Sequence, residues 1–234
     1  MKILAIIPAR CGSKGIKHKN IVKISGKPLI QYTIEPALKS LKNGLVERLI
    51  VSTDCEEIKQ VVQGLGVEVP FLRPKEISGD KAKAIDYIIH ALDFFGEKNI
   101  FFDAVLVLQP TAPLREYDDI EKSINLFKNF PNSDSLISCY KEEYFNSLVT
   151  YKKNNNLAIP VNPDHNKGIR RQEHETIFIR NGAIYIAKVK YLRKSLRIIA
   201  DIPLMYEMPK SKSVNIDTEE DLKILRKLLL FLVF

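Results

Sequence analysis

The apolar residues at positions 3–7 and 103–108 (ILAII and DAVLVL) form nearly uninterrupted runs rather than an alternating pattern. Such runs are typical of parallel strands that are covered on both faces of a sheet. Mixed runs predict four further strands, at 45–52, 66–72, 135–138 and 181–187. The chain is therefore expected to contain a mostly parallel, buried sheet.

Between these strands, apolar residues recur at the spacing that is typical of helices. It predicts helices at 28–39, 56–64, around 85–92, at 117–130 and at 219–230, and Pro36 is expected to kink or interrupt the first of them. Strands that alternate with helices predict an α/β fold with a doubly wound, mostly parallel, Rossmann-like sheet. A length of 234 residues fits one domain, 1–234, and the irregular polar stretch 139–178 is interpreted as an insertion within it.

A basic loop follows the first strand, and two glycines, Gly12 and Gly15, allow its backbone to turn. Its cations are Arg10, Lys14, Lys17 and Lys19. The carboxyl ends of strands in open α/β sheets bind ligands, so this loop is predicted to hold several phosphates. The spacing is not that of a Walker A motif, and a solvated basic turn is the alternative interpretation.

The overall charge agrees with an anionic partner without identifying it. The chain has a formal net charge of +8 and a pI of about 9.2, which nucleic acid, acidic lipid and a nucleoside triphosphate would all satisfy. No apolar run approaches the roughly 18 residues that a membrane span needs. The N-terminus lacks the pattern of a signal peptide, so a cytoplasmic location is expected.

Three cysteines, Cys11, Cys55 and Cys139, are too few and too widely spaced to indicate a disulfide framework or a zinc site. Cys11 lies in the basic loop, where Arg10 and Lys14 could lower its pKa and make it oxidisable. An inert small side chain is the favoured interpretation. The four histidines have no metal-ligand spacing.

Several motifs together carry a resemblance that covers nearly the whole chain. They are IPARCGSKGI at 7–16 followed by Lys19 and Asn20, VSTD at 51–54, LRP at 72–74, LQPTAPLR at 108–115, NGAIYI at 181–186 and IDTE at 216–219. In this order they resemble the acylneuraminate cytidylyltransferases. The resemblance implies transfer of CMP from CTP to a nonulosonic (sialic-type) acid with release of pyrophosphate. It also implies a Mg²⁺ cofactor and a homodimer in which 139–178 forms the dimerisation and substrate insertion.

The resemblance also assigns roles to individual residues. The implied catalytic residues are Arg10, Lys14 and Asp217, and the implied metal ligands are Asp217 and Asn215. The implied nucleotide-binding residues are Ala9, Arg10, Ser13, Lys14, Lys19, Asn20, Arg73 and Asp80. The implied sugar-binding residues are Gln109, Thr111, Arg171 and Arg180.

The chain departs from the family pattern at three places. Asn215 replaces the first of two alternating carboxylates, which a strand at 214–218 would place on one face. Ile179 stands where relatives carry a carboxylate-binding Arg, and a shift of one residue reverses the strand face, so Arg171 is the alternative to Arg180. Lysines at 81 and 83 replace small hydroxyl residues that follow Asp80 in relatives.

Some roles have ordinary structural alternatives. Asp217 could instead cap the helix at 219–230, and Asp54 is predicted to cap the helix at 56–64 rather than to face the nucleotide. Two other functions stay open: an RNA-binding module of the KH type, suggested by Gly-Ser-Lys-Gly, and a noncatalytic sugar-nucleotide binding protein. The sequence does not distinguish N-acetylneuraminic, legionaminic and pseudaminic acids as substrates.

Overall fold

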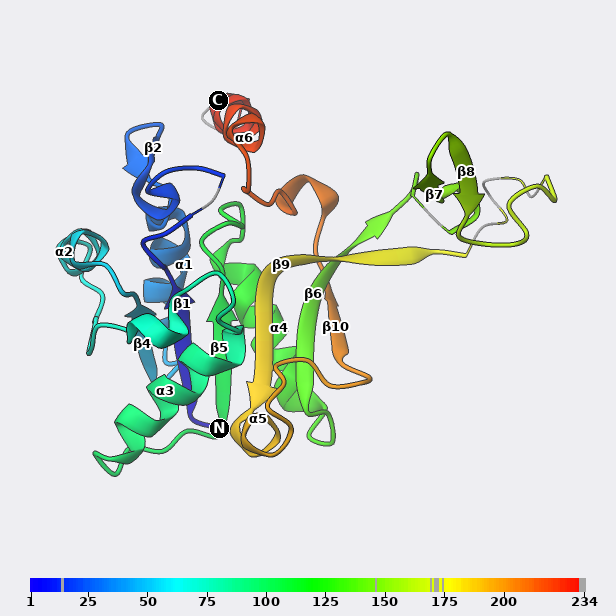
Figure 1. The fold of residues 1–234 in the computed structure, drawn as a ribbon. Helices are drawn as coiled ribbons and strands as arrows, with labels where there is room; N and C mark the ends of the chain where they lie inside the picture. The colour runs from blue at the N-terminus through cyan, green and yellow to red at the C-terminus, as the bar shows by residue number, and fades with distance from the viewer. Residues whose placement is uncertain (14, 146, 169, 171–172, 174, 232–234) are drawn as a thin grey trace.

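The structure is a computed structural model that describes residues 1–13, 15–145, 147–168, 170, 173 and 175–231. Its centre is a six-stranded sheet in the order β10-β6-β9-β5-β1-β4 (Figure 1). The strands are β1 (Ile3–Pro8), β4 (Arg48–Ser52), β5 (Ala104–Leu108), β6 (Ser135–Glu142), β9 (Ile177–Lys188) and β10 (Leu204–Glu207). β9 is antiparallel to both of its neighbours, while the other pairs are parallel. The predicted mostly parallel sheet is confirmed.

Helices cover both faces of this sheet, which explains why β1 is apolar at successive positions. The helices are α1 (Gln31–Lys42), α2 (Glu56–Gly64), α3 (Ala84–Gly96), α4 (Tyr117–Asn129), α5 (Val189–Ser195) and α6 (Glu219–Phe231). Ile3, Ala5 and Ile7 of β1 share one core cluster with α1, α2 and α4. Leu4 and Ile6 share another with α3 and α5. The doubly wound arrangement is therefore confirmed.

A third apolar cluster joins the two ends of the sequence. It consists of Ile16, Ile24, Leu29, Ile216, Leu222 and Leu225. These residues come from the basic loop, the small hairpin of β2 (Lys23–Ile24) and β3 (Lys27–Pro28), the segment before α6, and α6 itself. Figure 1 shows α6 beside the β2 region, at the end of the sheet where β1 and β5 finish. The C-terminal segment is thus packed against the loop that follows β1.

Several predicted elements are wrong in detail. Residues 66–72 form two isolated bridges rather than a strand, and Pro70 within them has no N–H to donate. Residues 214–218 are not a strand either, whereas β10 is an edge strand that was not predicted. α1 begins at Gln31 and continues through Pro36, because Ile34 and Ala37 are held in the core on either side of it.

The insertion is more ordered than its sequence indicates. β6 and β9 continue beyond the body of the sheet and carry η3 (Ser147–Val149) and a hairpin of β7 (Tyr151–Asn154) and β8 (Leu157–Pro160). Figure 1 shows this part, here called the arm (the described residues of 143–176), extending away from the rest of the molecule. Within the described residues, no helix has the length and apolar character needed to cross a membrane.

Candidate active site

A cavity of about 590 Å³ lies at the carboxyl ends of β1 and β5. The basic loop, the segment 77–84 before and at the start of α3, the turn after β5 and the segment before α6 all contribute to its wall. Ten residues predicted as site residues line it: Arg10, Ser13, Lys19, Asn20, Arg73, Asp80, Gln109, Thr111, Asn215 and Asp217. The fold therefore gathers groups that lie more than 200 positions apart in the sequence.

Two cations of the basic loop, Arg10 and Lys19, are held by carboxylates across the cavity. Arg10 donates from a terminal guanidinium nitrogen to Asp80 Oδ1 at 2.7 Å, and both side chains are partly exposed. Lys19 Nζ donates to Asp217 Oδ1 and to the Ile216 carbonyl, each at 2.9 Å. The exposed Arg10–Asp80 pair can exchange for another anion at little cost, because such pairs contribute little net stability in water.

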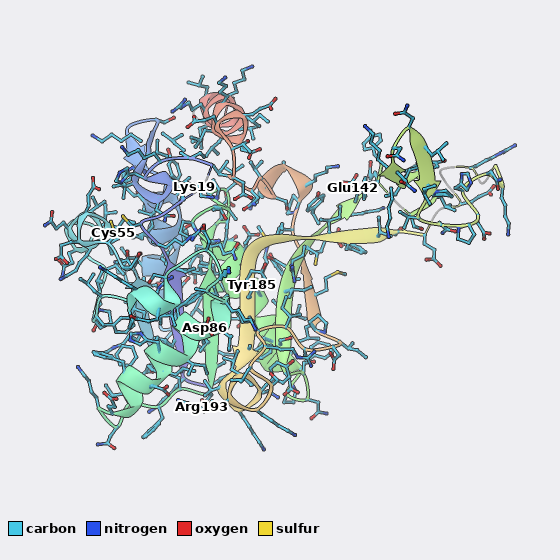
Figure 2. All side chains as sticks on the ribbon, in the orientation of Figure 1. Lys19, Cys55, Asp86, Glu142, Tyr185 and Arg193 are labelled. Carbon is cyan, nitrogen blue, oxygen red and sulfur yellow. The ribbon has the colours of Figure 1, made fainter. Side chains whose placement is uncertain are left out.

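Asn20 shapes the basic loop from inside. Its side chain is only 5% exposed, and its Nδ2 donates to the Arg10 carbonyl at 3.0 Å. Figure 2 labels Lys19 near the segment before α6. Asn20 thus fixes the backbone at Arg10, while its neighbour Lys19 contacts the C-terminal segment.

The backbone at Gly15 lies very close to the segment before α6. A Cβ atom at this position would lie 2.2 Å from the Asp217 carbonyl oxygen, far inside van der Waals contact. At Gly12, in the same loop, a Cβ would meet nothing within 4 Å. Only glycine at position 15 allows this approach, so Gly15 sets the distance between the basic loop and Asp217.

Arg73 lies beneath the cavity and is 6% exposed. Its guanidinium donates to the hydroxyl of Ser52 at 3.1 Å and to the Ser52 carbonyl at 2.5 Å, and it lies 4.8 Å from the centre of the Tyr87 ring. Burial lowers the pKa of Arg73, and burial raises the pKa of Tyr87. Tyr87 also lines the cavity and was not predicted; its only sequence signal is its place beside Ile88 on the buried face of α3.

A second cavity of about 300 Å³ adjoins the first. Gln109 and Asn215 line both cavities, and Arg180 lines the second. Ile179 and Arg180 both border it, although they are successive residues of β9. The pairing of β6 with β9 is irregular between Ile137 and Cys139, and Gly182 has a φ of +76°, so strict alternation of side chains does not hold here.

The turn after β5 is held against β9 by Arg115, whose role sequence reasoning missed although it ends the LQPTAPLR motif. This guanidinium is 2% exposed and donates to the Ala183 carbonyl at 2.6 Å, while its Nε and one terminal nitrogen have no partner in the described part of the chain. Burial lowers its pKa to about 9. A Cβ at Gly182 would lie 2.9 Å from Gln109 Oε1, so this glycine makes room for Gln109.

Other predicted residues have different outcomes. The side chain of Ala9 is fully buried in the core and does not line the cavity. Lys14 and Arg171 lie outside the described residues. Asp54 does not cap α2 as predicted; its Oδ1 accepts from the Cys11 amide at 2.8 Å, and Cys55 occupies the N-cap without a side-chain bond.

The start of α6 shows that the alternative role of Asp217, as the N-cap of this helix, is wrong. Thr218 directly precedes the helix, and its hydroxyl accepts from the Asp221 amide at 3.3 Å while Asp221 Oδ2 accepts from the Thr218 amide at 2.8 Å. Asp217 is not the cap, and its side chain is 63% exposed towards the cavity.

The pair Asn215 and Asp217 also fits a hard cation. Although 214–218 is not a strand, Asn215 Nδ2 donates to Asp217 Oδ2 at 2.5 Å, so the two side chains do meet. No group of three or more His, Cys, Asp or Glu residues suited to a metal occurs in the described ranges. One carboxylate and one amide oxygen suit Mg²⁺, which keeps several waters and takes its other ligands from phosphates.

Comparison with known proteins agrees with this geometry. Residues 4–230 match the family model described as cytidylyltransferase. The chain is 35% identical over 239 residues to the CMP-N,N'-diacetyllegionaminic acid synthase of Legionella pneumophila, covering 98% of this chain and 97% of that protein. It is 33% identical over 223 residues to the pseudaminic acid cytidylyltransferase of Campylobacter jejuni, covering 95% and 94%.

A third relative is longer. The N-acylneuraminate cytidylyltransferase of Escherichia coli O18:K1:H7 is 31% identical over 223 residues, which cover 95% of this chain and 51% of that protein. The chain therefore spans about half the length of that relative.

Solved structures show the same fold. A CMP:2-keto-3-deoxy-manno-octonic acid synthetase in complex with CTP superposes with a TM-score of 0.71 at 20% identity over 99% of both chains. A 4-diphosphocytidyl-2C-methyl-D-erythritol synthase superposes with a TM-score of 0.68 at 13% identity, over 97% of this chain and 98% of that one. By its sequence and its fold, this chain belongs to the cytidylyltransferase family of nucleotidyltransferases.

Proposed function

We propose that this protein couples CTP to a nonulosonic acid, giving the CMP-sugar and pyrophosphate. The observation that carries the proposal is one cavity that contains Arg10, Lys19, Arg73 and Asp217 and continues past Gln109 into a second cavity containing Arg180. Cations for a triphosphate and polar groups for an acidic sugar thus lie in adjoining spaces. The relatives from Legionella and Campylobacter are named for such sugars, which supports the same substrate class.

The basic loop would bind the triphosphate. Arg10 would leave Asp80, and Lys19 would leave Asp217, to bind phosphate oxygens. The two carboxylates would then face the solvent or a metal. Lys14 belongs to the same proposed set of phosphate-binding residues. Arg73, fixed by Ser52 and stacked on Tyr87, orients the nucleotide at the floor of the cavity. The rate gain would come from positioning and from neutralising charge on the departing pyrophosphate.

Asp217 and Asn215 would hold Mg²⁺ together with phosphate oxygens. When bound, the ion would neutralise phosphate charge and lower the pKa of the attacking hydroxyl. Lys19 and Asn215 bond to different carboxylate oxygens of Asp217, so transfer of Lys19 to the phosphates would free Oδ1 for the ion. Asn215 contributes no charge, so weak metal binding is expected.

The sugar would occupy the second cavity. Gln109 offers polar atoms at the boundary between the two spaces, Thr111 offers a hydroxyl in the first cavity, and Arg180 offers a guanidinium for the sugar carboxylate. The anomeric hydroxyl then faces the α-phosphate of CTP across Gln109. Which nonulosonic acid fits best depends on the residues around Tyr140 and Arg180, where relatives with different sugars are expected to differ.

The proposal includes a homodimer that is formed through the arm. Seven of its described residues are large, apolar and exposed: Tyr144, Phe145, Val149, Tyr151, Leu157, Ile159 and Val161. Several exposed apolar side chains on one protruding segment are typical of an interaction surface. Light scattering coupled to size exclusion is expected to give twice the chain mass of 26.8 kDa, and a monomer at micromolar concentration would contradict the dimer.

The reaction is tested by pyrophosphate release with each of the four nucleoside triphosphates and a panel of nonulosonic acids. Arg10→Ala and Lys14→Ala are expected to lose most turnover while circular dichroism stays unchanged. Lys17→Ala is the matched control, because Lys17 is an exposed cation of the same loop that does not line the cavity. Release with no combination, or equal loss in all three variants, would refute the proposal.

The same assay separates the two other functions. Tight CTP binding without any pyrophosphate release would favour the noncatalytic binding protein. The KH interpretation requires a loop that joins two helices, whereas the Gly12 to Gly15 turn lies between β1 and the short helix η1 (Lys19–Ile21). The KH interpretation would regain support only if the protein bound mixed RNA in a gel shift and showed no nucleotidyl transfer.

A further inference from the structure

The basic loop meets α2 through two cysteines that are 44 positions apart. Cys55 Sγ lies 2.9 Å from Cys11 Sγ. Cys11 is half-buried in the basic loop, and Cys55, 7% exposed, is the N-cap of α2. Figure 2 labels Cys55 beside α2, on the side of the sheet where β4 is the edge strand. Two of the three thiols of the chain are thus in direct contact, and Cys11 is bonded in sequence to Arg10, which lines the larger cavity.

We propose that Cys11 and Cys55 form a redox-modification site, in which a low-molecular-weight disulfide such as oxidised glutathione converts them to an intramolecular disulfide that ties the basic loop to α2. The sulfur atoms must approach by only about 0.9 Å to reach the usual bond length of about 2.04 Å. None of the residue roles assigned above uses either thiol.

The exchange proceeds in two balanced steps. The more exposed Cys11, as the thiolate, attacks one sulfur of oxidised glutathione and releases the first glutathione thiolate. Cys55 then loses its proton and attacks the Cys11 sulfur, which expels the second. Two protein thiols are oxidised, one small disulfide is reduced, and the two protons end on the two glutathione molecules.

The bond would act on the phosphate-binding groups through the backbone. Cys11 directly follows Arg10, and its amide is already fixed to Asp54 Oδ1 at 2.8 Å. The Arg10 carbonyl is fixed by Asn20 at 3.0 Å. Moving Cys11 towards α2 therefore moves Arg10 relative to the triphosphate, and a misplacement of about 1 Å can lower turnover on the order of 100-fold. A loss of at least about tenfold is expected.

The surroundings of Cys11 make the reaction slow at neutral pH. The hydrogen bond with Cys55, followed by burial and the nearby carboxylates of Asp54 and Glu57, raises the pKa of Cys11 to about 11. Because only the thiolate attacks, the rate of closure is expected to rise about tenfold for each pH unit between about 7 and 9. The site would thus respond to sustained oxidation rather than to brief exposure.

The test treats the whole protein with excess oxidised glutathione and then blocks the remaining thiols. A peptide linking Cys11 to Cys55 is expected by mass spectrometry, with the number of titratable thiols falling from three to one. Pyrophosphate release should fall at least about tenfold and return with dithiothreitol. Separate mixed disulfides, a link between two molecules, or a linked protein with unchanged turnover would overturn the proposal.

Two variants complete the design. Cys55→Ala is expected to keep its turnover under the same treatment to within about twofold and to carry glutathione on Cys11 alone, whereas Cys139→Ser should respond like the parent chain. Equal inactivation of Cys55→Ala would overturn the proposal. The linked peptide is detected whether or not the chain transfers CMP, so failure of the proposed enzymatic function is distinguishable from failure of this site.

Discussion

Substitution of Gly15 by alanine tests how closely the two ends of the chain must approach. The added Cβ would lie 2.2 Å from the Asp217 carbonyl oxygen, where ordinary contacts begin at 3.4 Å. The basic loop and the segment before α6 must therefore separate by more than about 1 Å, which is expected to cost about 1–3 kcal/mol of stability. The same displacement separates the proposed phosphate-binding cations from the proposed metal ligand, and turnover should fall on the order of 100-fold.

Gly12→Ala is the matched control, because it adds the same methyl group to the same loop with nothing within 4 Å. Pyrophosphate release with saturating CTP and sugar measures the activity of both variants, and thermal melting measures their stability. Gly12→Ala should stay within about twofold of the parent in turnover and within about 0.5 kcal/mol in stability. If Gly15→Ala is as active as Gly12→Ala, the argument that this contact sets the geometry of the site is wrong.

Three other variants give independent checks. Asn215→Asp adds a second carboxylate beside Asp217 and should lower the Mg²⁺ concentration for half-maximal activity several-fold; superimposable titrations would discard the metal assignment. Arg180→Ala should raise KM for the acidic sugar about tenfold or more and leave KM for CTP unchanged, and the reverse pattern would exclude the proposed sugar cavity. Lys210, by hydrogen bonding, lowers the pKa of Glu142 from 4.5 to about 2. This contribution to stability is complete above pH 4.5 and is lost as pH falls towards 2. Urea unfolding of Glu142→Gln should therefore vary less between pH 5 and 3 than that of the parent; equal slopes would contradict it.

The sheet could be predicted from sequence because its signal is local. Uninterrupted apolar runs such as 3–7 are typical of strands covered on both faces, and β1 contributes to one core cluster on each face. The local pattern was misleading at 66–72, where only two isolated bridges form, and the strand that the resemblance implied at 214–218 does not form. Pairing is a long-range property that no short window of sequence contains.

For the candidate site, too, one part could be predicted from the sequence and another could not. The chain itself determined which residue types were present: cations and glycines in the loop at 10–19, carboxylate and amide at 215–217, and polar groups after the strand at 103–108. Only the tertiary structure decided that Gly15 touches Asp217, that Arg180 borders a cavity despite its register, and that Cys11 meets Cys55. The amino-acid sequence determines which chemical groups are present. The distance between groups on separate segments is set only when the core packs into one arrangement and excludes the others.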